Sequence, residues 1–188
     1  MKKVDVRSPI YTIVRDNECA GGSAIVELLV KNTKTQIRNF RKVTPLLYRG
    51  GQPQLDQIQG LKEYGITTVV CLRYSPVTIA RERRAVEAAG MKFISIPMFY
   101  WRVPSNEEIE QFMDLMEDES ATPIFVHCYH GADRTGLLVG MYRIARQGWS
   151  FDAAYAEMKK CGFHRFTLRH FKWILWHYAK RHKQAKSS

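Results

Sequence analysis

The sequence lacks the segments that mark membrane-spanning and exported proteins. No uninterrupted apolar run approaches the roughly 20 residues that a membrane-spanning helix needs. The first 30 residues carry charges throughout and show no apolar core before a cleavage-like site, so we expect no signal peptide. The cytoplasm is then the default compartment. A periplasmic or secreted location stays open if a leader was removed from this chain.

Cysteine is scarce, and its spacing excludes the usual cysteine-rich classes. The four cysteines are Cys19, Cys71, Cys128 and Cys161, and no two of them form a CxxC pair. Their dispersal argues against a disulfide framework and against a zinc site. We expect three of them to be small packing residues. Only Cys128 lies in a setting that suggests chemistry.

Acidic residues are also few, which leaves a strong positive charge. The chain has 18 Asp and Glu residues and 29 Lys and Arg residues, which gives a formal net charge of +11. No acid follows Glu157, whereas nine basic residues do: Lys159, Lys160, Arg165, Arg169, Lys172, Lys180, Arg181, Lys183 and Lys186. A positive field concentrates anions near a protein and speeds their arrival. The excess fits either a solvated basic face or an anionic substrate or partner.

The chain shows no internal repeat and no low-complexity segment. Its 188 residues are enough for one domain with a sizeable core. We expect a single domain over 1–188, made of an N-terminal extension (1–40), a catalytic core (41–180) and a basic tail (181–188). The segment 23–32, "SAIVELLVKN", is compatible with a helix or a strand.

From residue 45 onward, predicted strands alternate with predicted helices. Runs rich in apolar and β-branched residues predict strands at 45–50, 66–74, 91–98 and 123–128. Helical spacing of apolar residues, with Gly65, Gly90 and Gly148 as stops, predicts helices at 53–65, 78–90, 109–118, 134–148, 151–162 and 167–183. Ser105 and Glu108 form a capping box before the third helix.

This alternation predicts an α/β fold. Strands that are apolar on both faces are typical of a parallel sheet covered by helices on both sides. We therefore expect a central, mostly parallel sheet of four to five strands with helices on both faces. Ligands bind beyond the carboxyl ends of the strands in such folds. Cys128 lies at one of these ends.

The turn after Cys128 predicts a phosphate-binding loop. "HCYHGADRTG" (127–136) runs from the end of a strand through Tyr129–Ala132 into a helix that starts at about Arg134. Gly131 allows a tight bend, and amides in a turn that feeds a helix point into one concavity and bind an anion. Arg134 can grip two oxygens of a phosphate with its planar guanidinium.

The same positive potential acts on the Cys128 thiol. A free cysteine has a pKa of about 8.5, and helix N-termini or adjacent cations lower that value. We expect a thiolate at the base of the loop, within reach of the bound phosphorus. The arrangement predicts covalent catalysis through a phosphocysteine that water later hydrolyses. The hydroxyl of Thr135 can stabilise the thiolate when it leaves.

These residues resemble a known superfamily. "HCYHGADRTG" matches the His-Cys-x5-Arg-Ser/Thr signature of the cysteine-dependent protein tyrosine phosphatases, in their atypical dual-specificity-like branch. "LLYRGGQPQLDQIQGLKEYGITTVVCLR" (46–73) resembles the opening of compact bacterial, plant and fungal members. The resemblance covers roughly 40–165. It implies that Cys128 is the nucleophile, that Arg134 and the amides of 129–134 hold the phosphate, and that no metal or other cofactor is used.

The sequence departs from the family pattern at the position where the general acid is usually found. Such enzymes usually take an aspartate from the loop that here reads "PMFYWRVPS" (97–105), which contains no carboxylate. Glu107 and Glu108 come next, but acids at a helix start are explained by capping and by the helix dipole. Asp133 is the alternative, because myotubularin-type phosphoinositide phosphatases share the "ADRT" ending. We expect Asp133 to protonate the leaving oxygen and His130 to line the wall of the loop.

Three substrate classes remain open. The basic excess favours an inositol polyphosphate such as phytate, and phytase-like relatives act on such compounds. Arg49 and Arg73 end predicted strands and Arg102 lies in the loop that covers the site, so all three are expected to contact substrate. A phosphotyrosine protein is the default substrate of the superfamily. RNA 5′-phosphatases share the "HC-x-HG-x-x-RTG" pattern, and the C-terminal segment mixes cations with aromatic residues.

An alternative from a different functional class is a non-catalytic binding module, which would hold a phosphorylated partner without hydrolysing it. Binding alone needs no nucleophile, so the joint presence of Cys128, Arg134 and Thr135 favours an enzyme. The expected partner is an anionic phosphorylated small molecule, with a phosphoprotein or RNA as alternatives. The sequence does not indicate the oligomeric state.

Overall fold

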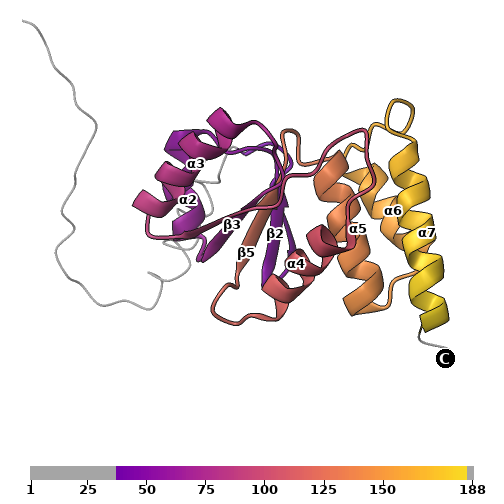
Figure 1. Ribbon diagram of the computed structural model, residues 1–188. Helices are drawn as coiled ribbons and strands as arrows, with labels where there is room; N and C mark the ends of the chain where they lie inside the picture. The colour runs from indigo at the N-terminus through magenta and orange to yellow at the C-terminus, as the bar shows by residue number, and fades with distance from the viewer. Residues whose placement is uncertain (1–36, 186–188) are drawn as a thin grey trace, which may run out of the picture. The chain divides into compact units, whose positions relative to one another are not determined.

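The computed structural model describes residues 37–185 of the chain (Figure 1). Several sequence-based expectations lie outside these residues: the segment 23–32, Cys19, most of the N-terminal extension and the last three residues of the tail. Within the described part, no helix is long and apolar enough to cross a membrane.

Five strands form one sheet in the order β1-β2-β5-β3-β4. The strands are β1 (Arg41–Thr44), β2 (Leu47–Gly50), β3 (Thr68–Cys71), β4 (Lys92–Ser95) and β5 (Ile124–His127). Strand β1 pairs antiparallel with β2, and the other pairs are parallel. The mostly parallel sheet predicted from the sequence is confirmed.

Strand β1 was not predicted, for a physical reason. It is an edge strand of four residues, RKVT, and its first two residues are exposed. So short a strand has neither an apolar run nor a clear alternation to reveal it.

In the part of the chain that the structure describes, six α-helices connect and flank the strands. They are α2 (Ile58–Glu63), α3 (Pro76–Ala88), α4 (Asn106–Glu117), α5 (Asp133–Gln147), α6 (Phe151–Lys160) and α7 (His170–Ala185). A 3-10 turn, η1 (Leu55–Gln57), precedes α2, so the helix predicted from Pro53 begins as a 3-10 turn and becomes an α-helix only at Ile58. Helix α7 begins three residues later than the sequence pattern suggested.

Two apolar clusters hold the helices on opposite faces of the sheet. Val69 of β3 and Phe125 of β5 pack with α2 and α3. Val70 and Val126, their neighbours in the same strands, point the other way and pack with α4, α5, α6 and α7. Figure 1 shows α2 and α3 on one side of the sheet and α5, α6 and α7 on the other. The alternation of side chains along each strand thus produces the three-layer arrangement.

Two predicted helix ends are confirmed. The Ser105 hydroxyl accepts a hydrogen bond from the Glu108 amide, and the Glu108 carboxylate accepts one from the Ser105 amide at 2.9 Å, which is the predicted capping box. Gly148 ends α5 in the left-handed conformation, with φ of 68°. Such ends fix where α4 and α5 begin and stop relative to the sheet.

Candidate active site

The candidate site lies where β5 gives way to α5. His127 ends β5 and Asp133 begins α5, so residues 128–132 form the connecting loop. His127 pairs with Gly50 of β2 and Cys71 of β3, which places the carboxyl ends of three parallel strands beside the loop. The Cys128 side chain is only 2% exposed and lies at the base of this loop.

The loop approaches the backbone of β2 more closely than a side chain would allow. Gly131 has a φ of 69°, and a Cβ placed on it would lie 2.2 Å from the carbonyl carbon of Gly50. The predicted tight bend is therefore confirmed, and the requirement for glycine comes from contact as well as from conformation.

Arg49 lies behind the loop and not at its mouth. It is 1% exposed, and its Nη2 donates a hydrogen bond to the Gly131 carbonyl oxygen at 2.8 Å. Asn39 supports the loop from a second side, because its side-chain amide donates to the His130 carbonyl oxygen at 3.0 Å. The expectation that Arg49 contacts substrate does not fit this geometry. Its strand-end position gave no information on which way the side chain points.

The surroundings of Cys128 favour its ionised form. Burial by itself raises the pKa of the Cys128 thiol. The Arg134 charge, the Thr135 hydroxyl and the amides of Thr135 and Gly131 outweigh that effect and lower the pKa below its usual value. The predicted direction of the shift is therefore confirmed, and the opposing effect of burial is what the sequence did not reveal.

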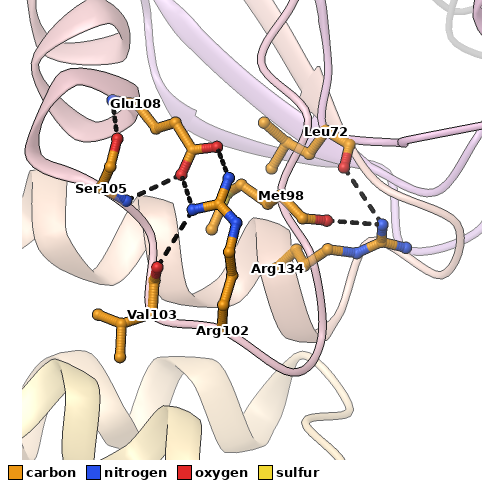
Figure 2. A network of polar contacts seen from close by, with 7 residues as sticks. All are labelled: Leu72, Met98, Arg102, Val103, Ser105, Glu108 and Arg134. Carbon is orange, nitrogen blue, oxygen red and sulfur yellow. Dashed lines mark hydrogen bonds and ion pairs between the residues drawn. The ribbon is translucent and has the colours of Figure 1, made fainter.

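The Arg134 guanidinium is held inside the fold. Its Nη1 donates to the carbonyl oxygens of Leu72 and Met98, each at 3.2 Å, as Figure 2 shows. Its Nη2 donates to the Tyr100 hydroxyl at 2.7 Å, and the guanidinium stacks 4.2 Å from the centre of the Tyr100 ring. Arg134 Nε has no hydrogen-bond partner among residues 37–185, so part of its donor capacity remains for an anion.

Asp133, the predicted general acid, forms a pair with a distant histidine. The Asp133 side chain is almost fully buried, and its Oδ1 accepts a hydrogen bond from the His164 amide at 2.9 Å. His164 Nδ1 lies 2.9 Å from Asp133 Oδ2. The His164 imidazole is 47% exposed, so the pair connects the buried carboxylate to the protein surface.

A second buried pair lies directly behind Cys128. His127 Nε2 lies 2.6 Å from Glu82 Oε1 of α3, and both side chains are almost completely buried. His127 Nδ1 lies 3.2 Å from the Cys128 carbonyl oxygen. Burial lowers the pKa of His127, but Glu82 and Cys71 outweigh it and raise the pKa well above its usual value. The pair thus links α3 to the backbone of the nucleophile.

Among the described residues, two groups of side chains have donor atoms close enough to hold a metal ion. They are Cys71, Glu82 and His127, and His130, Asp133 and His164. In each group the carboxylate is already paired with an imidazole. These contacts account for both groups without an ion.

The remaining predicted residues divide between two sides of the loop. Arg73, Tyr129 and His130 line one cavity, and the Arg73 guanidinium stacks 4.9 Å from the centre of the Tyr129 ring. Arg102 instead turns to α4, where it pairs with Glu108 (Figure 2). Its side chain is 40% exposed and lies 5.0 Å from the centre of the Phe99 ring, so its contact with substrate stays a prediction.

Sequence reasoning did not find Tyr100 or His164 as site residues. Tyr100 lies in the loop that was noted only for lacking a carboxylate, and His164 lies between α6 and α7. Neither belongs to a motif, and each reaches the site through contacts between distant parts of the chain, Tyr100 with Arg134 and His164 with Asp133. His170 of α7 holds the Tyr100 loop, with its Nε2 2.6 Å from the Tyr100 carbonyl oxygen.

Comparisons with known proteins identify phosphatases as relatives of this chain. A family model described as "DSP-PTPase phosphatase fused to NAD+ Kinase" matches residues 23–174. The dual specificity protein phosphatase TpbA of Pseudomonas aeruginosa is 34% identical over 126 residues, which are 66% of this chain and 55% of TpbA. The inositol diphosphatase DSP1 of Oryza sativa is 24% identical over 133 residues, 65% of this chain and 56% of DSP1. The chain thus spans about half the length of these relatives.

Solved structures show the same fold. The catalytic domain of the PP-IP phosphatase SIW14 from S. cerevisiae, in complex with citrate, superposes with a TM-score of 0.65. The match covers 76% of this chain and 86% of that one at 21% identity. The α/β architecture predicted from the sequence is therefore that of known phosphatases of this type.

Proposed function

We propose, since this chain belongs to the DSP-PTPase phosphatase family of the cysteine-dependent protein tyrosine phosphatase superfamily, that it hydrolyses phosphate monoesters. The observation that carries the proposal is the loop 128–134. It combines a buried thiol of lowered pKa with the Arg134 guanidinium at the start of α5. A thiolate under a ring of amides can attack a bound phosphate, whereas a binding module needs no such group.

The first step forms a covalent intermediate. Cys128 Sγ attacks the phosphorus, the S–P bond forms, and the P–O bond to the ester oxygen breaks. The leaving oxygen takes a proton from Asp133, and the resulting carboxylate stays paired with His164 until the second step. Arg134 and the loop amides balance the negative charge on the phosphoryl oxygens.

The second step releases inorganic phosphate. A water molecule attacks the phosphorus and gives its proton to Asp133, and the S–P bond breaks. The Thr135 hydroxyl is buried beside Cys128 and stabilises the thiolate as it departs. No metal ion or organic cofactor takes part in either step.

The substrate we propose is an inositol polyphosphate. The net charge of +11 favours a polyanion. The names of two relatives support the same class, since DSP1 is called an inositol diphosphatase and SIW14 a PP-IP phosphatase.

A protein tyrosine phosphatase is the second candidate, and an aromatic cluster favours it. Tyr74 stacks on Phe99 at 5.0 Å, and Trp101 lies 5.5 Å from Tyr74 and is 69% exposed. The Arg134 guanidinium lies 5.6 Å from the Tyr74 ring, so the cluster borders the site. Such a wall would suit the ring of a phosphotyrosine.

Turnover of p-nitrophenyl phosphate tests the activity. We expect Cys128→Ser to lower it by at least about a thousandfold, because no other nucleophile serves the loop. Acid quenching of the wild-type enzyme during turnover should trap a phosphate on Cys128. Binding of phosphate without turnover in the wild type would instead identify a binding module.

Phosphate release from three substrates then ranks the classes. We expect inositol hexakisphosphate to exceed a phosphotyrosine peptide and a 5′-triphosphorylated RNA in kcat/KM. A clear preference for the peptide would replace the inositol assignment with the second candidate.

A further inference from the structure

A cationic cavity adjoins the phosphate-binding loop. It has a volume of about 480 Å³ and is lined by residues of four chain segments, among them Arg38, Gln52, Arg73, Arg81, Tyr129 and His130. Tyr129 and His130 belong to the loop itself, so the cavity borders the loop that would hold the phosphate above Cys128. The mechanism proposed above does not use this cavity.

The cavity has an excess of positive charge. Three of its lining residues are arginines, and Glu82 is the one acid among the described residues around it. The Glu82 carboxylate is neutralised by His127 at 2.6 Å and also accepts a hydrogen bond from the Gln52 side chain at 3.2 Å. Glu82 therefore adds little negative potential to the cavity, and the three arginines make the potential there positive.

The cations come from separate elements that the fold holds in place. Arg73 follows β3, donates a hydrogen bond to the Gln52 side-chain oxygen and stacks on Tyr129. Arg81 extends from α3, and Arg38 is close enough to His130 that its charge helps burial to lower the pKa of that imidazole. Arginine is suited to bind phosphate with two parallel hydrogen bonds.

We propose that this cavity binds a second phosphate group of the substrate whose first phosphate reacts with Cys128. The inference rests on the phosphatase function proposed above and refines it. The enzyme then selects small molecules that carry two or more phosphates, and a monophosphate leaves the cavity unused. An inositol ring with several phosphates fits this requirement, whereas the side chain of a single phosphotyrosine does not.

Arg81 offers the sharpest test, because a matched control lies on the same helix. Arg81 and Arg84 are both exposed on α3, but only Arg81 lines the cavity. Binding is measured by calorimetry on protein carrying Cys128→Ser, which prevents turnover. The ligands are inositol hexakisphosphate, an inositol monophosphate and inorganic phosphate.

We expect Arg81→Ala to raise the Kd for inositol hexakisphosphate by about tenfold, and Arg81→Glu to raise it further. The Kd values for the two single-phosphate ligands should change much less, so the ratio between ligands falls. Arg84→Ala should leave all three Kd values as they were. Equal losses of affinity for inositol hexakisphosphate in Arg81→Ala and Arg84→Ala would overturn the inference. They would indicate that only the overall positive charge of the protein attracts the ligand. Equal losses for all three ligands would also overturn it.

This binding readout separates the inference from the function on which it rests. A wild-type protein that binds as expected but does not hydrolyse p-nitrophenyl phosphate would refute the phosphatase proposal and leave the cavity assignment standing. Hydrolysis of that compound together with an unchanged ligand ratio in Arg81→Ala would refute the cavity assignment alone.

Discussion

At the scale of single residues, Asp133 of the Asp133–His164 pair is the position whose replacement should most change the chemistry, because it is the proposed general acid. Proton donation matters most when the leaving group is a poor one, and a general acid contributes about 10²- to 10⁴-fold. We expect Asp133→Asn to lower turnover of an alkyl phosphate by about 100-fold. Turnover of p-nitrophenyl phosphate should fall much less, because its leaving group departs without a proton. The measurement is kcat/KM for both compounds.

The role of His164 is read from the same two substrates. His164→Gln removes the imidazole that holds the Asp133 carboxylate, so we expect it to affect the alkyl phosphate more than the aryl phosphate. His177, an exposed histidine of α7, is the matched control, and His177→Gln should change neither rate. Full activity of Asp133→Asn on the alkyl phosphate would contradict the assignment of the acid.

At the scale of residues, the sequence predicted what lies within one continuous motif. Cys128, Asp133 and Arg134 are brought together by the loop itself, so spacing alone placed them. Arg49 was expected at the mouth and lies behind the loop, because a position at a strand end does not determine the direction of a long side chain. His164 joins the site through packing between elements, which no local pattern encodes.

The junction of β5 and α5 depends on one glycine, and a second glycine provides the comparison. Gly131 and Gly148 have nearly the same φ, 69° and 68°, but only Gly131 touches another segment. Gly148→Ala meets nothing within 4 Å and should cost about 1 kcal/mol of folding free energy, from backbone strain alone. Gly131→Ala must also displace the backbone of Gly50, so it should cost about 3 kcal/mol.

Chemical denaturation and activity measurements check both variants. Gly148→Ala should keep its activity because the end of α5 is remote from the loop. Gly131→Ala should lose most activity even where it remains folded, since the loop amides would move. Equal stability and activity in the two variants would contradict the close approach to β2.

At the scale of elements, prediction succeeded where local signals were strong. The capping box at Ser105 and the Gly148 stop marked α4 and α5, and apolar β-branched runs marked β3 and β5. Strand β1 was missed because its pairing with β2 comes from the hairpin and not from an apolar pattern. Helix α7 begins later than predicted because residues 165–169, directly before His170, form turns between α6 and α7.

At the scale of the whole molecule, the His127–Glu82 pair joins α3 to the end of β5, next to the loop that carries Cys128. Glu82 comes from α3 on one face, and His127 adjoins the loop that leads to α5 on the other. Removing one partner of a buried ion pair costs more than the pair contributes, since the other charge is left without compensation. The pair therefore couples the stability of the fold to the position of the nucleophile.

The raised pKa of His127 makes this stability depend on pH. Because the folded-state pKa lies well above 6.5, the pair contributes fully below about pH 6.5, where the unfolded histidine is also protonated. Its contribution is lost as the pH rises through the folded-state pKa. We expect the free energy of unfolding to decrease from pH 6.5 to 9 in the wild type, measured by urea denaturation.

Glu82→Gln removes the cause of that slope. At pH 6 it should lose about 3 kcal/mol, because a buried imidazolium would lack its counter-ion. Burial would then lower the pKa of His127, so the decrease above pH 6.5 should disappear. Glu87→Gln on the same helix removes a half-exposed pair with Arg83 and should cost at most about 0.5 kcal/mol with the wild-type slope. Parallel pH profiles for wild type and Glu82→Gln would show that His127 is neutral in the folded protein.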